Sequence, residues 1–186
     1  YEFFKNIKEN NHNITFIPYG TSDGGYVEYP EFNPQQSYDQ RERDWYKNAL
    51  DREGTAVSEP YITSVSKEAV VSIDKKVVSE GKTVGVLSIT INIQDFMKNI
   101  SMIRYGETGY ISILSQNDVF INSPGNPSWL MKKASDVLPQ SYGEIKDMDG
   151  EFFESDFKGD GGYVTKVMNR YESPYSGWNY VSVIDK

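Results

Sequence analysis

Residues 38–49, YDQRERDWYKNA, bring together side chains that could bind a small anion. Arg43 carries a planar, permanently charged fork of N–H donors that matches the two oxygens of a carboxylate. Tyr38, Trp45 and Tyr46 add rings that exclude water and polar ends that donate hydrogen bonds. None of these groups is an activated nucleophile or a tuned general base. The stretch therefore predicts that an anion is bound rather than chemically changed.

The same residues also have a purely structural interpretation. Arg43 could form a surface ion pair with Asp39 or Asp44, which lie close to it in the sequence. Trp45 and Tyr46 could be core aromatics at the start of a helix, because helical spacing begins at Asp44. The two interpretations are compatible, since one face of a short helix can border a pocket while the other packs inward.

The composition limits the possible functions. The chain has 186 residues, of which 38% are hydrophobic and 25% charged, as expected for folded domains with a hydrophobic core. Its net charge of −8 argues against binding to nucleic acid or to anionic lipid, both of which require clustered Lys and Arg. Because the chain has no Cys, it can form neither disulfides nor zinc–thiolate sites.

Other residues give no sign of catalysis or of a cofactor. His12 is the only histidine, which excludes a Ser-His-Asp triad and a multi-histidine metal site. A group of acids surrounds Gly150, but no glutamate follows at the offset that a calcium-binding EF-hand loop requires. We interpret these acids as a solvated acidic hairpin: Asp147, Asp149, Glu151, Glu154, Asp156 and Asp160. An extracellular hydrolase with paired carboxylates is disfavoured, since no acid lies in an apolar sequence context.

The elements around the anion-binding stretch are predicted from hydrophobic periodicity and turn residues. Asp23-Gly24-Gly25 is a hairpin signal between two short strands. Residues 1–8 have helical spacing and are expected to be the end of a helix that begins upstream. The predicted strands cover residues 14–20, 26–29, 69–78 and 83–93, and the predicted helices cover residues 44–50 and 94–103.

After residue 103 a similar plan starts again. The predicted strands of this part include residues 110–114, 119–122, 163–168 and 178–184, with a short helical segment over residues 129–138. The simplest interpretation is two consecutive α+β units, residues 1–103 and residues 104–186.

In this order the segments resemble a known family, the double Cache (dCache_1, tandem PDC-like) sensor domains. These are extracytoplasmic domains of bacterial and archaeal chemoreceptors, sensor histidine kinases and related transmembrane proteins. The segments that carry the resemblance are TSDGGYVEYP, YDQRERDWYKNA, SEPYITSVSKEAVVSIDKKV, GKTVGVLSITINI and GETGYISILSQNDVFINSP.

The resemblance implies an α+β fold of two tandem PAS-like (PDC/Cache) units. Each unit would have a central antiparallel sheet flanked by helices, and residues 1–8 would be the end of a long helix rising from the membrane. Residues 1–103 would form the membrane-distal, ligand-binding unit and residues 104–186 the membrane-proximal one. The domain would lie outside the cytoplasm, tethered to the membrane by flanking helices, as a possible homodimer.

The resemblance also implies roles for individual residues. In the amino-acid-binding branch of the family, a set of aromatic residues and an arginine grips the ligand carboxylate. Tyr38, Arg43, Trp45 and Tyr46 match that set in type and spacing, and Tyr61 matches a further pocket tyrosine.

Two positions depart from the family pattern. Where that branch has aspartates that bind the ligand ammonium, this chain has Thr63 and Thr90. An ammonium group buried without a carboxylate costs several kcal/mol. We therefore expect a small carboxylate without an amine, such as a 2-oxo or 2-hydroxy acid, unless Asp74 or Glu59 supplies the missing charge.

The sequence thus predicts a non-enzymatic sensor domain for a small carboxylate, with no cofactor. One alternative is an amino-acid-binding Cache domain with a replaced ammonium site. Another is a Cache domain that binds a protein partner and no small molecule. The cytoplasmic part of the full-length protein, which could be a histidine kinase, is not predicted.

Overall fold

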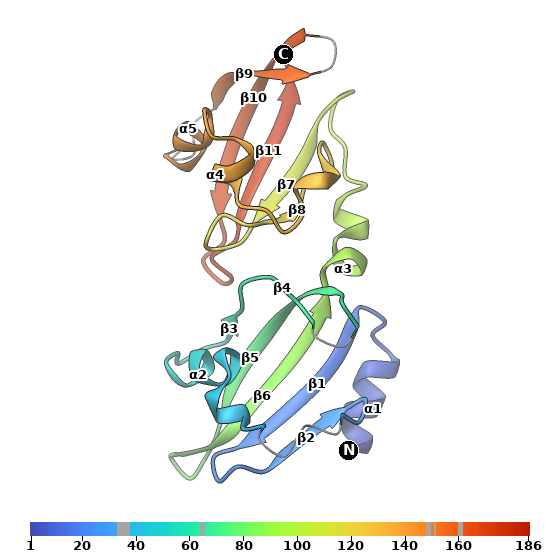
Figure 1. The fold of residues 1–186 in the computed structure, drawn as a ribbon, viewed down its shortest axis with the longest axis vertical. Helices are drawn as coiled ribbons and strands as arrows, with labels where there is room; N and C mark the ends of the chain where they lie inside the picture. Colours follow the sequence, from blue (N-terminus) through green and yellow to red (C-terminus); the bar gives the residue numbers. More distant parts are fainter. Residues whose placement is uncertain (33–37, 64–65, 148–149, 151, 160–161) are drawn as a thin grey trace. The chain divides into compact units, whose positions relative to one another are not determined.

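The computed structural model describes residues 1–32, 38–63, 66–147, 150, 152–159 and 162–186. The chain divides into two compact units, Tyr1–Phe96 and Met97–Lys186, each built around an antiparallel sheet (Figure 1). The expected α+β class is therefore confirmed. The sequence placed the boundary after residue 103, whereas the two units divide within helix α3 (Ile93–Ile100).

The sheet of the first unit has the strand order β2-β1-β6-β5-β3, with β4 also paired to β5. Its two longest strands, β5 and β6, form a hairpin at the predicted place. The short strands β3 and β4 were not predicted, because two residues are too few to show a period. The strands are β1 (Ile14–Thr21), β2 (Tyr26–Tyr29), β3 (Ala56–Val57), β4 (Tyr61–Ile62), β5 (Ala69–Ser79) and β6 (Lys82–Asn92).

The helical elements of the first unit are short. Helix α2 packs its buried residues Tyr46 and Ala49 against Val86 of β6. The elements are α1 (Glu2–Glu9), the 3-10 helix η1 (Gln40–Glu42), α2 (Asp44–Leu50) and α3. Within the described part of the chain, no helix is long and apolar enough to cross a bilayer.

A buried glutamine fixes the segment that leads into α2. Gln40 is 1% exposed, and its side-chain amide donates to the backbone oxygens of Thr21 (3.3 Å) and Gly25 (3.0 Å) in the β1–β2 hairpin. A Cβ at Gly20 would overlap the Gln40 side chain, so glycine is needed there for the close approach. This clamp holds η1 against the hairpin and thereby sets the position of Arg43.

The sheet of the second unit has the order β8-β7-β11-β10-β9. The expected helical segment over residues 129–138 consists of two separate short elements, η2 and α4. The strands and helices of the second unit are β7 (Tyr110–Leu114), β8 (Phe120–Asn122), η2 (Pro127–Trp129), α4 (Ala134–Val137), α5 (Tyr142–Lys146), β9 (Phe153–Gly159), β10 (Gly162–Glu172) and β11 (Asn179–Asp185). Its buried cluster comprises Leu114, Phe120, Ala134, Ile145, Met168, Val181 and Val183.

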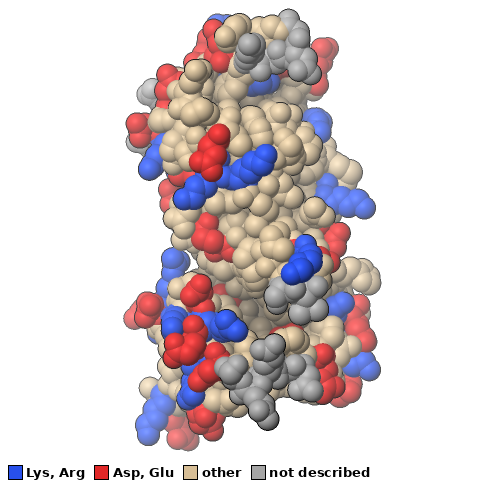
Figure 2. Space-filling view, in the orientation of Figure 1, with Lys and Arg blue, Asp and Glu red and all other residues tan. Residues whose placement is uncertain are grey.

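The acidic segment of the second unit lies partly in a hairpin. Strands β9 and β10 pair from Phe153 with Met168 to Gly159 with Gly162. Three of the acids, Asp149, Glu151 and Asp160, lie outside the described residues. Acidic and basic atoms are intermixed on the face of the molecule shown in Figure 2.

Candidate ligand-binding site

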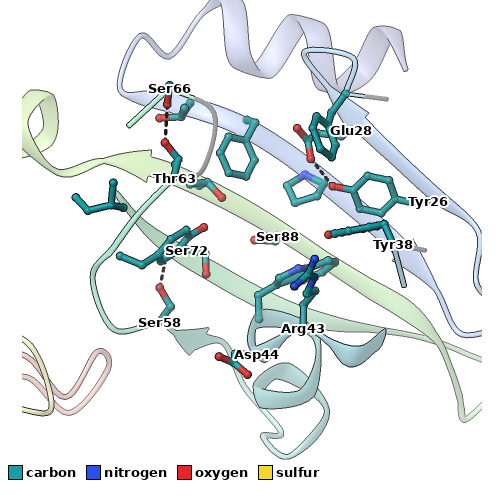
Figure 3. A pocket seen from close by; sticks show the side chains of 18 of the residues that line it. Tyr26, Glu28, Tyr38, Arg43, Asp44, Ser58, Thr63, Ser66, Ser72 and Ser88 are labelled. Carbon is teal, nitrogen blue, oxygen red and sulfur yellow. Dashed lines mark hydrogen bonds between the residues drawn. The ribbon is translucent and has the colours of Figure 1, made fainter. Parts of the chain in front are cut away.

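The first unit contains a cavity of about 1400 Å³ above the β1, β5 and β6 side of its sheet (Figure 3). The cavity is open to solvent, because Arg43, Asp44 and Phe32 in its wall are exposed. All but one of the predicted site residues line it. Those that do are Tyr38, Arg43, Trp45, Tyr61, Thr63 and Thr90.

Arg43 lies at the N-terminal end of α2 with its guanidinium carbon 4.8 Å from the centre of the Tyr38 ring. This is a cation–π contact. The alternative of a surface ion pair between Arg43 and Asp39 is not seen, because Asp39 pairs with Arg41 at 2.6 Å instead. Among the described residues no carboxylate pairs with Arg43 either, and Asp44 only borders the same cavity. The N–H fork of Arg43 is thus available to an anion.

Trp45 and Tyr46 have different surroundings although they are neighbours in the sequence. The half-buried Trp45 lines the cavity, and its ring meets the Tyr46 ring edge to face at 5.5 Å. Tyr46 is 3% exposed and packs with Ala49 and Val86 in the core instead. Consecutive helical residues point in directions about 100° apart, so α2 cannot aim both rings at one cavity. The structure therefore does not bring Tyr46 to the site.

Tyr61, Thr63 and Thr90 lie in a second part of the wall. Burial raises the pKa of Tyr61 to about 12, and the Thr90 hydroxyl opposes this rise. The Tyr61 and Thr90 hydroxyls do not meet hydrogen-bond geometry, and Thr90 Oγ1 has no hydrogen-bond partner among the described residues. Thr63 differs, since its hydroxyl contacts that of Ser66 at 2.7 Å and accepts from the Glu68 N–H.

The floor of the cavity is polar where the β5–β6 hairpin passes below it. Ser72 pairs across the strands with Thr90, and Asp74 pairs with Ser88. Because side chains alternate along a strand, these four residues share one face of the sheet. All four are at most 1% exposed. Ser72, Ser88 and Thr90 line the cavity, and in Figure 3 Ser88 lies between Arg43 on one side and Ser66 on the other.

Asp74 lies beside the two serines, on the same face of the sheet. The hydroxyl of Ser72 donates to one Asp74 oxygen at 2.9 Å, and the hydroxyl of Ser88 donates to the other at 2.5 Å. Burial raises the pKa of Asp74 to about 6, although both hydrogen bonds oppose the rise. The sequence analysis named Asp74 as a possible source of the missing charge but did not predict its position in the site. Polar residues at every second position of two apolar strands are the signal that could have done so.

Further carboxylates border the cavity. Glu28 of β2 accepts a hydrogen bond from the Tyr26 hydroxyl, and burial raises the pKa of both groups. Glu59, the other acid that the sequence named, also lines the wall. Tyr26 and Glu28 were missed, although their alternation in a strand beside a hairpin turn would have placed them on one face.

The arrangement suits binding of a small polar molecule. Its wall carries several aromatic rings and the guanidinium of Arg43, which forms no ion pair within the described part of the chain. Its floor carries hydroxyls that are hydrogen-bonded to a carboxylate. In the described ranges of the chain, no group of three or more His, Cys, Asp or Glu side chains is placed to hold a metal ion.

Known proteins share both the sequence pattern and the fold. The family model dCache_1, described as a Cache domain, matches residues 1–186. The chain is 32% identical over 176 residues to the methyl-accepting chemotaxis protein TlpA of Bacillus subtilis (strain 168), covering 94% of this chain and 25% of that protein. It is 30% identical over 121 residues to McpG of Pseudomonas putida, covering 65% of this chain and 19% of that protein. The chain thus spans about a quarter or less of the length of these relatives.

Solved structures include two similar ligand-binding domains. That of the amino acid chemoreceptor PctB from Pseudomonas aeruginosa PAO1, in complex with L-Arg, superposes with a TM-score of 0.77 at 25% identity, covering 100% of this chain and 78% of that one. That of the chemoreceptor CtaA from Pseudomonas fluorescens, in complex with L-serine, gives 0.75 at 22% identity and covers 97% and 78%. With a family match over its full length, the chain belongs to the Cache domain family, dCache_1.

Proposed function

We propose that this chain is the extracytoplasmic sensor domain of a membrane-tethered chemoreceptor, and that the cavity of its first unit binds a small carboxylate-bearing metabolite. The observation that carries the proposal is the guanidinium of Arg43 in the cavity wall, which has no carboxylate partner among the residues that the structure describes. Relatives named as methyl-accepting chemotaxis proteins support the sensory role. Solved relatives in complex with L-Arg and L-serine, both of which carry a carboxylate, support the ligand class.

The bound carboxylate would lie against Arg43, with Tyr38 and Trp45 beside it. Tyr38 already holds the guanidinium by its ring face, which reduces the freedom that Arg43 loses when it binds an anion. Trp45 can donate its indole N–H and shield the contact from water. These groups bind a carboxylate without reacting with it, which is what a sensor requires.

A ligand held in this way would signal by a shift in population. It favours one of two conformations of the domain only by its differential affinity for them. Because the cavity wall combines α2 with strands β2, β4, β5 and β6, a ligand that contacts several of these elements stabilises one arrangement of them. We propose that this arrangement is the state that the receptor reports across the membrane.

Calorimetry and thermal shift with a panel of small carboxylates test the proposal. We expect at least one acid to stabilise the domain, and Arg43→Ala to weaken its binding by about 10- to 100-fold, since a charge-assisted hydrogen bond contributes roughly 1.5–3 kcal/mol. Arg43→Lys should recover only part of this loss, because an ammonium group cannot pair with both carboxylate oxygens at once.

Arg41→Ala is the matched control. Arg41 is also an exposed arginine of the same stretch, but it pairs with Asp39 and does not line the cavity, so we expect unchanged affinity. Full binding by the Arg43→Ala variant would overturn the proposed site. Indifference of the domain to every carboxylate would instead favour the alternative of a Cache domain that binds a protein partner.

A further inference from the structure

The most unusual group near the cavity is the buried carboxylate of Asp74. It is 0% exposed, and its two described hydrogen bonds come from the neutral hydroxyls of Ser72 and Ser88. Among the described residues no Lys or Arg forms an ion pair with it. An ionised carboxylate that is buried without a cation is costly, and natural proteins rarely keep one without a functional reason.

The two serines hydrogen-bond to Asp74 and line the cavity, which Asp74 itself does not. Each hydroxyl has a single proton, and in both residues that proton is directed at Asp74. What remains for the cavity is the lone-pair side of each oxygen. The floor at Ser72 and Ser88 therefore offers hydrogen-bond acceptors to a ligand, and the Asp74 carboxylate is hydrogen-bonded to both of them.

Thr90 supplies a third oxygen on the same face. It lies across the strands from Ser72, is 1% exposed and lines the cavity, yet its hydroxyl has no partner among the described residues. A buried polar atom without a partner costs about 1–3 kcal/mol, so such an atom in a cavity wall indicates a group that a ligand satisfies. Three oxygens in one patch match the three N–H donors of a primary ammonium group.

We propose that Asp74 is the charge partner for a primary ammonium group of the ligand and that it acts through the hydroxyls of Ser72 and Ser88. This inference rests on the proposed carboxylate site. It adds a binding site for a second functional group of the same ligand, so that the ligand would be an amino-carboxylate. It reverses the expectation drawn from Thr63 and Thr90, because the missing charge is supplied from β5 rather than from those positions.

The experiment compares acids that differ only in whether an amino group or a hydroxyl group is present. The probes are L-alanine with L-lactate, L-serine with L-glycerate, and 4-aminobutanoate with 4-hydroxybutanoate. We expect the wild-type domain to bind the amino member of at least one pair at least about tenfold more tightly, as a charge-assisted hydrogen bond requires. In Asp74→Asn, which keeps the size and the acceptor oxygen, this preference should fall to less than about threefold.

A second variant tests the route through the serines. Ser88→Ala removes one acceptor from the cavity floor but leaves the carboxylate in place. We expect it to weaken binding of the amino member more than that of its hydroxy counterpart. Glu80→Gln is the matched charge control, because Glu80 is an exposed acid at the turn of the same β5–β6 hairpin and does not line the cavity. It should leave the preference unchanged.

The outcomes separate this inference from the proposed function. If the hydroxy members bind as well as the amino members and Asp74→Asn changes neither, the role of Asp74 is overturned while the carboxylate site at Arg43 stands. If Asp74→Asn still binds the amino member more tightly than the hydroxy member, the role of Asp74 is also overturned. Glu28 or Glu59 in the cavity wall would then be the charge partner to test. If neither these acids nor any carboxylate of the wider panel binds, the proposed function itself fails, and this inference fails with it.

Discussion

At the scale of single residues, Asp74 couples the stability of the domain to pH. Its pKa of about 6 in the folded state lies above the ordinary value of 3.8 because the carboxyl group is buried. The folded state therefore holds this proton more firmly than the unfolded state does. The stabilising effect is fully present below about pH 4 and is lost as the pH rises through about 6, a change of about 3 kcal/mol in the free energy of unfolding.

Asp74→Asn should remove this dependence. We expect the variant to be more stable than the wild type at pH 8 and to show a smaller difference at pH 4.5, as measured by urea unfolding without ligand. The pKa of Glu28 is also raised, but Glu28 is present in both proteins, so its contribution to the pH dependence cancels in the comparison. Tyr61 stays neutral over this pH range because its pKa is about 12. A difference between the two proteins that does not change with pH would show that Asp74 does not carry a buried charge.

At the scale of elements, the clamp between η1 and the β1–β2 hairpin positions the side of the cavity that carries Arg43. Gln40→Ala removes both hydrogen bonds to the hairpin carbonyls and leaves a void in a closely packed place. We expect a loss of about 1–3 kcal/mol in the free energy of unfolding. Carboxylate affinity should fall as well, because Arg43 follows directly after η1.

Denaturation and calorimetry on the same variant measure both effects. Gln94→Ala is a suitable control, since Gln94 is exposed in α3 and does not line the cavity. Wild-type affinity in Gln40→Ala, in spite of lower stability, would mean that α2 alone positions Arg43.

At the scale of the whole molecule, the two units should respond differently to the ligand. All the described residues that line the cavity belong to the first unit, Tyr1–Phe96. A ligand at 100 times its Kd stabilises the state that binds it by about 2.7 kcal/mol. We therefore expect hydrogen exchange to slow most in α2, β5 and β6 and to change less in the sheet of the second unit. Protection confined to the second unit would place the binding site there.

The family and the order of the elements could be predicted from the sequence because their signals are local. The hairpin signal at Asp23-Gly24-Gly25, the apolar runs of β5 and β6 and the helix at Asp44–Leu50 each depend on a few consecutive residues. The α+β class and the Cache family followed from these segments in order, and both are confirmed. The grouping of Arg43 with Tyr38 and Trp45 was equally local, since the three lie within eight residues of one another.

The sequence by itself thus determined the fold class and singled out the stretch that we propose binds an anion, whereas only the tertiary structure decided what surrounds that stretch. The tertiary structure places Tyr46 in the core and Asp74 within hydrogen-bond distance of Ser72 and Ser88. The reason is physical. Which residues of β5 lie opposite which residues of β6 is fixed by strand register, and a shift of one residue would turn Asp74 to the other face of the sheet. Register depends on packing across the whole sheet, so no short stretch of sequence contains it.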